Sequence, residues 1–222
     1  LSEDFVCNIT PNNSYTQTKT FTQSPLTGTS SSTAFYNFKG QLYRSADSSK
    51  ESVNKYEYSY DSTGRLGAAT SVSEGFTSKI QQKETHVWKY DDNCPENMFR
   101  IKNGTDTTIV RFVCDERGNI TEEESWRHNI STDKIYYYYD SLHRLSDVVR
   151  YNNRLGRLLP DYIFEYNDEG QLAQMITVQG GSDYLIWRYE YAENGLKTRE
   201  LCFNKQKSLV GKIEYQYTFK GR

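Results

Sequence analysis

A short motif that ends in a tight turn recurs along this chain and constrains its fold more than any other feature. The clearest copy runs from Tyr58 to Leu66 and reads Tyr-Ser-Tyr-Asp-Ser-Thr-Gly-Arg-Leu. Aromatic residues at alternate positions are typical of a half-buried β-strand, and Asp-x-x-Gly is typical of a type I turn followed by a left-handed residue. Leu66 would then begin a returning strand, so each copy of the motif predicts one β-hairpin.

Copies of this motif, some of them degenerate, fill the chain from residue 33 onward. In the later copies the turn position recurs every 25 to 27 residues, which accommodates two strands of about eight residues with a turn and a connector. The third copy lacks the glycine, so it predicts a longer turn through Pro95 to Asn97 and a returning strand from Met98 to Ile101. The copies lie at 36–42, 58–66, 88–92, 112–120, 137–145, 164–172, 189–196 and 215–222.

Aromatic residues alternate with polar ones within the predicted strands. Phe164 and Tyr166 would share one face of their strand, for example, while Glu165 faces the other way. The chain is only 36% hydrophobic, yet it contains 19 Tyr, 10 Phe and 3 Trp, and such amphipathic rings suit a sheet with one buried face. Since no helical pattern is long enough to cover that face, the sheet must curl on itself or fold over as a two-layer sandwich.

We therefore predict an all-β fold, an antiparallel meander of about 14–16 strands from repeated β-hairpins, curled by its twist into an open barrel or spiral shell. Residues 33–222 would form a single domain of about seven to eight hairpin repeats. Residues 1–32 form a polar N-terminal segment rich in Ser, Thr, Asn and Gln. In this segment we predict an edge strand over Thr16–Thr22 and a loop over Ser24–Ser32.

Charge and hydropathy exclude some partners. The formal net charge of −2 is interspersed along the chain and gives no electrostatic reason to expect nucleic acid. No apolar run approaches the roughly 20 residues of a membrane-spanning helix, so no membrane span is predicted. Because the chain begins at Leu1 rather than Met, we expect a mature form from which a signal peptide or lipoprotein leader was removed.

Four cysteines, Cys7, Cys94, Cys114 and Cys202, are far apart in the sequence. Without a Cys-x-x-Cys pair, a zinc site is not predicted. In an oxidising compartment the cysteines allow up to two disulfides, in any of three pairings. Unpaired buried thiols are an equally good interpretation for Cys114 and Cys202.

A carboxylate recurs at the turn position, in Asp61, Asp115 and Asp140. A repeated carboxylate can indicate metal binding, but capping of the turn's own amides accounts for it without a metal. His143 stands where other copies have Gly, and we predict a left-handed backbone there. Glu122 and Glu124 would share one side of a strand; we interpret them as a solvated face rather than a pair of hydrolytic carboxylates. No catalytic residue, metal or cofactor is predicted.

Three aromatic residues are candidates for a contact surface. Tyr136 and Tyr138 would lie on the face opposite Tyr137 and Tyr139, and that face is polar elsewhere. Trp126 would also lie off the main aromatic face. Exposed aromatic side chains on a polar face often mark an interaction site, so we predict a contact surface at these three residues.

The repeated motif resembles the YD repeat of the Rhs family, which is also seen in the shells of toxin-complex and teneurin proteins. The match is to the kernel Tyr-x-Tyr-Asp-x-x-Gly-Arg-Leu, complete at 58–66 and nearly complete at 137–145, where His143 replaces Gly. The resemblance covers roughly residues 33–222. It implies a spiral β-sheet in the cell envelope, on the surface or outside the cell. The short chain looks like secreted or lipid-anchored proteins of Bacteroidetes-type bacteria.

The resemblance implies a non-enzymatic cell-envelope or extracellular scaffold that contacts another macromolecule, an envelope or extracellular protein or a glycan. Two alternatives remain. One is a glycan-binding module that uses exposed aromatic residues, and the other is a carrier of an apolar ligand inside the curled sheet.

Overall fold

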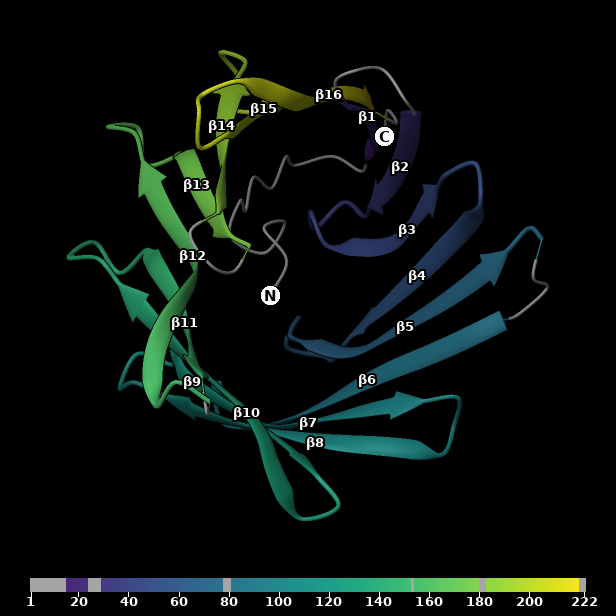
Figure 1. Ribbon diagram of the computed structural model, residues 1–222. Coiled ribbons are helices and arrows are strands. Elements are labelled where there is room, and N and C mark those ends of the chain that lie inside the picture. The colour runs from purple at the N-terminus through teal and green to yellow at the C-terminus, as the bar shows by residue number, and fades with distance from the viewer. Residues whose placement is uncertain (1–14, 24–28, 78–80, 153, 180–182, 220–222) are drawn as a thin grey trace. The chain divides into compact units, whose positions relative to one another are not determined.

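The computed structural model describes residues 15–23, 29–77, 81–152, 154–179 and 183–219, and these ranges form sixteen antiparallel β-strands in a meander (Figure 1). The strands are β1 (Tyr15–Gln23), β2 (Thr29–Tyr36), β3 (Leu42–Ser48), β4 (Ser52–Tyr60), β5 (Leu66–Gly75), β6 (Gln81–Asp91), β7 (Cys94–Lys102), β8 (Asp106–Cys114), β9 (Ile120–Arg127), β10 (Ile130–Tyr139), β11 (Leu145–Asn152), β12 (Arg157–Tyr166), β13 (Leu172–Val178), β14 (Tyr184–Tyr191), β15 (Lys197–Asn204) and β16 (Leu209–Phe219).

The strand order closes on itself, because β1 pairs with both β2 and β16 (Figure 1). Tyr15 lies opposite Tyr36 on one side and opposite Phe219 on the other. β1 lies beside β16 on the side where the other hairpins have their returning strand. The all-β meander is confirmed, but the predicted open barrel or spiral shell is wrong, since closure leaves neither end strand with an unpaired edge.

The N-terminal segment contributes more to the sheet than its polar composition indicates. β1 was predicted as an edge strand, yet its backbone groups are used in two ladders. The predicted loop over Ser24–Ser32 is wrong at its end, because β2 begins at Thr29; residues 24–28 lie outside the described ranges. The predicted division at residue 32 thus falls inside a strand.

Two compact units make up the chain: residues 1–50 together with 161–222, and residues 51–160. In motif strands of both units, β4 and β14, aromatic residues on one face are buried or half-buried and charged residues on the other are exposed. In β4, Tyr56 and Tyr58 are half-buried on one face, whereas Lys55 and Glu57 are exposed on the other. The predicted alternation of aromatic and polar faces is therefore confirmed.

The repeated turns have the predicted geometry. In the clearest copy, the amide of Gly64 donates to the carbonyl oxygen of Asp61 at 3.0 Å, and Gly64 has a φ of 89°. One carboxylate oxygen of Asp61, Oδ1, accepts the amides of Thr63 and Arg65, each at 2.9 Å. Asp115 and Asp140 accept the amides at the same two positions of their own turns. The recurring aspartate therefore caps the turn.

His143 has a φ of 60° and donates its amide to the carbonyl oxygen of Asp140 at 2.9 Å, as the glycines do in the other copies. The predicted left-handed backbone is confirmed. Lys207, with a φ of 62°, takes the same place in the turn that begins at Asn204 and joins β15 to β16. An aromatic residue, Phe203, precedes that turn as in the motif, but the turn has no Gly, and the sequence analysis did not include it among the copies.

The third predicted turn is shorter than expected. β6 ends at Asp91 and β7 begins at Cys94, so the predicted turn through Pro95 to Asn97 is wrong. Pro95 pairs with Tyr90 inside the ladder, at a shift of register. A bulge is one of the few places in a sheet that tolerate proline, because one backbone group is already unpaired there.

In several copies a tyrosine at the turn end of the leading strand forms a hydrogen bond to the preceding hairpin. The hydroxyl of Tyr139 donates to the carbonyl oxygen of Ile120 at 2.8 Å, and that of Tyr191 donates to Leu172 at 2.8 Å. Tyr90 and Tyr217 make the same bond to Leu66 and Lys197. Each acceptor is the first residue of the preceding hairpin's returning strand. The second tyrosine of the motif thus fixes how successive hairpins sit together, which the sequence alone did not show.

Replacing Tyr139 with phenylalanine is expected to lower the free energy of unfolding by about 1 kcal/mol, because the carbonyl of Ile120 loses its donor. Burial, and then the carboxylate of Asp115, raise the pKa of Tyr139 to about 12, so the hydroxyl donates throughout the neutral range. Urea denaturation measures the change. Tyr138→Phe is the matched control and should stay within about 0.5 kcal/mol of the parent; equal losses in both variants would contradict the role of this hydrogen bond.

Acid is expected to weaken the hairpins through their turn carboxylates. The hydroxyl of Thr63 and the guanidinium of Arg65 hold the pKa of Asp61 below its ordinary value, and the side chain of Asn119 does the same for the pKa of Asp115. In Asp140 the main cause of the lowered pKa is the amide of Arg144. A folded-state pKa below the unfolded value gives stability that is complete above about pH 4 and is lost as the pH falls through the folded pKa.

Thermal melts between pH 7 and pH 2 measure this loss. A variant with Asn at all three positions should lose less stability on acidification than the parent does, because Asn cannot titrate. Asn should still cap the turn, since Asn37 already accepts the amides of Lys39 and Gln41 in the first hairpin. Identical acid transitions in the two proteins would show that other groups govern the response.

Candidate binding sites

The predicted contact residues lie on β9 and β10, in the unit formed by residues 51–160. Tyr138 is 46% exposed, while Tyr136 and Trp126 are half-buried. Tyr137, between the two tyrosines, points to the opposite face and is buried. Its hydroxyl donates to Glu123 at 2.6 Å. We refer to Trp126, Tyr136 and Tyr138 as the exposed aromatic strip.

Charged side chains cover the rings of this strip. The guanidinium of Arg111 lies 5.1 Å from the centre of the Trp126 ring, and Lys134 Nζ lies 5.2 Å from that of Tyr136. Lys134 also pairs with Glu122 at 2.9 Å. Hydrogen bonds to Glu122 and Tyr136 raise the pKa of Lys134, so its charge persists through the neutral range. The strip therefore combines aromatic surface with fixed charge.

The strip shares one face but is not one cluster. Tyr136 lies opposite Glu122, and Trp126 is four residues further along β9, about 13 Å away at roughly 3.3 Å per residue. Between them, Glu124 accepts a hydrogen bond from Ser131 at 2.8 Å. The structure thus brings Tyr136 and Tyr138 together and leaves Trp126 apart.

The cysteines adopt one of the pairings that the sequence left open. Cys94 begins β7 and Cys114 ends β8; they form a disulfide with a Cα–Cα distance of 6.0 Å. The interpretation of Cys114 as an unpaired thiol is therefore wrong, whereas Cys202 is a buried free thiol. Burial, and then the carboxylate of Glu200, raise the pKa of Cys202 to about 11, so the thiol is not a ready nucleophile. Cys7 lies outside the described residues.

A buried ion pair interrupts the aromatic face of the unit that contains β13–β16. Lys197 Nζ lies 2.7 Å from Glu200 Oε1, and the hydroxyl of Tyr215 donates to the same oxygen. The ammonium also lies 4.8 Å from the ring centre of Tyr189. The sequence analysis did not predict this ion pair. Residues three apart on a strand normally face opposite ways, but a bulge in β15 after Lys197 reverses the alternation.

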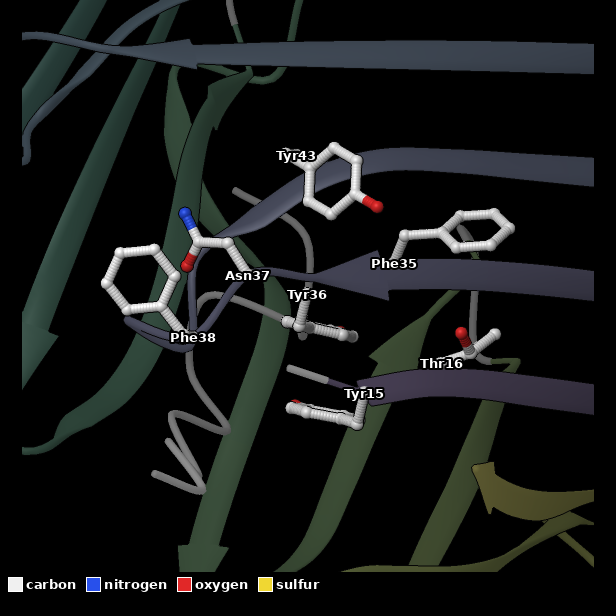
Figure 2. Close-up of a pocket in the computed structure, with 7 residues that line it drawn as sticks. All are labelled: Tyr15, Thr16, Phe35, Tyr36, Asn37, Phe38 and Tyr43. Atoms are coloured by element: carbon white, nitrogen blue, oxygen red, sulfur yellow. The ribbon is translucent and has the colours of Figure 1, made fainter. Parts of the chain in front are cut away.

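An aromatic pocket of about 240 Å³ lies at the turn end of β1, β2 and β3 (Figure 2). The rings of Tyr15 and Tyr36 stack with centres 4.3 Å apart, and Phe35 lies 6.3 Å from Tyr43. In Figure 2 the two stacked rings lie parallel, and Phe38 extends from the turn at one end. The seven lining residues are Tyr15, Thr16, Phe35, Tyr36, Asn37, Phe38 and Tyr43. The sequence analysis did not propose this site.

Neither a metal centre nor a membrane-spanning helix was found in the described part of the chain. Within those ranges, no group of three or more His, Cys, Asp or Glu side chains is arranged to hold a metal ion. The same ranges contain no helix with the length and apolar character needed to cross a membrane.

Comparison with known proteins gives a fold and no family. No protein-family model matches the sequence, and no curated protein is similar to it. Among solved structures, the chain is similar to a porin-like protein from Bacteroides uniformis, with a TM-score of 0.59 and 10% identity. The match covers 96% of this chain and 99% of the other. At that identity the likeness shows the closed all-β fold and nothing of the activity.

Proposed function

We propose that this chain is a non-enzymatic scaffold of the cell envelope or extracellular space that holds another macromolecule on the exposed aromatic strip. The observation that carries the proposal is Tyr138, which is 46% exposed beside Tyr136 on a rigid, charged sheet face. Tyrosine, tryptophan and arginine are enriched at the centres of protein interfaces, because they offer large contact area with few rotatable bonds.

The proposed extracytoplasmic location is supported by the disulfide as well as by the similarity to other proteins. The Cys94–Cys114 disulfide favours an oxidising compartment, since thiols stay reduced in the cytosol. The porin-like description of the structural neighbour also favours the envelope. The resemblance to YD repeats is supported by the turns, which use the motif's Asp and Gly as capping and left-handed residues.

Within the envelope, we place this scaffold outside the bilayer. Membrane barrels need an apolar band about 25 Å tall on their lipid-facing side, where buried Lys or Arg costs about 2–4 kcal/mol. Arg111 and Lys134 lie in the middle of β8 and β10 on one face of the sheet. Glu84 and Arg100 lie on the opposite face, in β6 and β7. Charged residues therefore lie in the middle of strands on both faces of the sheet, and this disfavours an apolar lipid-facing band on either face.

A glycan is the second candidate ligand, and the aromatic pocket favours it. The apolar-ligand carrier is the weaker alternative, because an ion pair, Lys197–Glu200, occupies the aromatic face in one unit.

The role of the exposed aromatic strip is tested by using the protein to capture its binding partners from envelope extracts. The double variant Tyr136→Ala/Tyr138→Ala should keep the parent's melting temperature and lose envelope components that the parent retains. Tyr184, an exposed tyrosine of β14 outside the strip, supplies the control; Tyr184→Ala should retain them. Unchanged capture by the double variant would refute the proposal, and a large fall in melting temperature would place the two rings in the core instead.

A further inference from the structure

The first hairpin differs from the others at a turn position that faces solvent. Phe38 follows the capping Asn37 and is 71% exposed. Exposing a phenylalanine in a turn contributes nothing to folding, because its apolar area stays in water. All the corresponding turns carry polar residues at this position: Ser62, Glu116, Ser141, Asp168 and Glu193.

A second aromatic residue in the same hairpin is equally unusual. Tyr43 is the second residue of the returning strand and is 43% exposed. The other returning strands carry small residues there: Gly67, Thr121, Ser146, Ala173 and Thr198. Both aromatic replacements line the pocket in Figure 2. Since five sibling hairpins fold without aromatic residues at these two positions, the hairpin itself does not require Phe38 or Tyr43.

The lining of the pocket restricts what can occupy it. On the face of the sheet that carries Phe35, the polar groups are the hydroxyls of Thr16 and Tyr43, and the amide of Asn37 is engaged in the turn. None of the seven lining residues is Asp, Glu, Lys, Arg or His. The guanidinium of Arg44 lies 4.6 Å from the ring centre of Phe35, one of the lining residues. A cation is therefore disfavoured, even though aromatic rings can bind one.

Size and surface chemistry favour a single sugar ring. A volume of about 240 Å³ lies below the roughly 300–1,000 Å³ of pockets that hold drug-sized ligands. The C–H face of a pyranose ring is apolar and weakly positive, so it packs against the negative face of an aromatic ring. The hydroxyl groups of the sugar would then meet the hydroxyls of Thr16 and Tyr43, which can both donate and accept hydrogen bonds.

We infer that the aromatic pocket of the first hairpin binds a neutral pyranose residue of a glycan. This inference rests on the glycan-binding candidate above and names its site and ligand class. It does not use the exposed aromatic strip, which belongs to other strands.

The full chain is tested on an array of neutral oligosaccharides ending in glucose, galactose, mannose or N-acetylglucosamine. The dissociation constant of the best-bound sugar is then measured by titration calorimetry. Phe38→Ser and Tyr43→Thr introduce residues that the sibling hairpins already carry, so both variants should fold as the parent does. Each is expected to weaken binding tenfold or more, at an unchanged melting temperature.

The strip variant Tyr136→Ala/Tyr138→Ala is the matched control and should bind the sugar as the parent does. The inference is overturned if no neutral saccharide binds at millimolar concentration, or if the Phe38→Ser/Tyr43→Thr double variant keeps the parent's affinity. If only the strip variant lost sugar binding, the glycan-binding site would be the exposed aromatic strip and not the pocket. If no sugar on the array bound, but the parent still captured envelope components through the strip, the pocket inference would be rejected and the scaffold proposal would be retained.

Discussion

Glu200→Met is expected to lower the free energy of unfolding by about 3–5 kcal/mol, because it removes the carboxylate from a buried ammonium group. Glu200 is 1% exposed and Lys197 is 5% exposed, so water cannot readily replace the lost partner. The hydroxyl of Tyr215 also loses its acceptor. Chemical denaturation at neutral pH, with the midpoint and the slope fitted separately, measures the change.

The neighbouring hairpin supplies the control for this substitution. Leu172 and Met175 occupy in β13 the places that Lys197 and Glu200 occupy in β15, and the hydroxyl of Tyr189 contacts the sulfur of Met175 at 3.8 Å. The double variant Lys197→Leu/Glu200→Met copies that arrangement and should recover most of the lost stability, because no charge is left buried. A single variant that costs less than about 1 kcal/mol would show that the ion pair is hydrated.

The hairpins were predictable because their signals are local. Alternating rings, a capping Asp61 and a left-handed Gly64 lie within nine consecutive residues, and the two turn residues make their hydrogen bonds within that stretch. The closure of the sheet was not predictable in the same way. It depends on the pairing of β1 with β16, almost the whole chain apart, and β1 carries no copy of the motif. Its alternation of Tyr15, Gln17 and Lys19 is hidden among threonines.

The sequence analysis missed two side-chain clusters, because predicting them required either the position of a bulge or a comparison between copies of the motif. In a regular strand Lys197 and Glu200 would lie on opposite faces, and the bulge after Lys197 places them on the same face. The same bulge recurs in the sibling hairpins, so only a comparison between copies would have shown it. The pocket did have a signal, since Phe38 and Tyr43 are the aromatic exceptions at otherwise polar or small positions. That signal appears only when each position is compared across all copies, including the degenerate first one.

Removing the disulfide is the second large effect expected. Cys94→Ser/Cys114→Ser should lower the free energy of unfolding by about 3 kcal/mol, because a cross-link between residues 20 apart restricts the unfolded chain. For a chain of this length the melting temperature should fall by roughly 6–12 °C, at about 2–4 °C per kcal/mol. Thermal melts of the parent with and without dithiothreitol should differ by a similar amount.

A variant of the free thiol Cys202 provides the control that distinguishes loss of the disulfide from a general response to reductant. Cys202→Ala keeps the cross-link, so its melting temperature should still fall on reduction, whereas the Cys94→Ser/Cys114→Ser variant should not respond. Equal melting temperatures for the parent in both conditions would show that the disulfide contributes nothing to stability. A measured response would mean that the reducing cytosol weakens the unit formed by residues 51–160, which is the unit that carries the exposed aromatic strip. The proposed binding surface would then be most stable in the oxidising compartment where we place the protein.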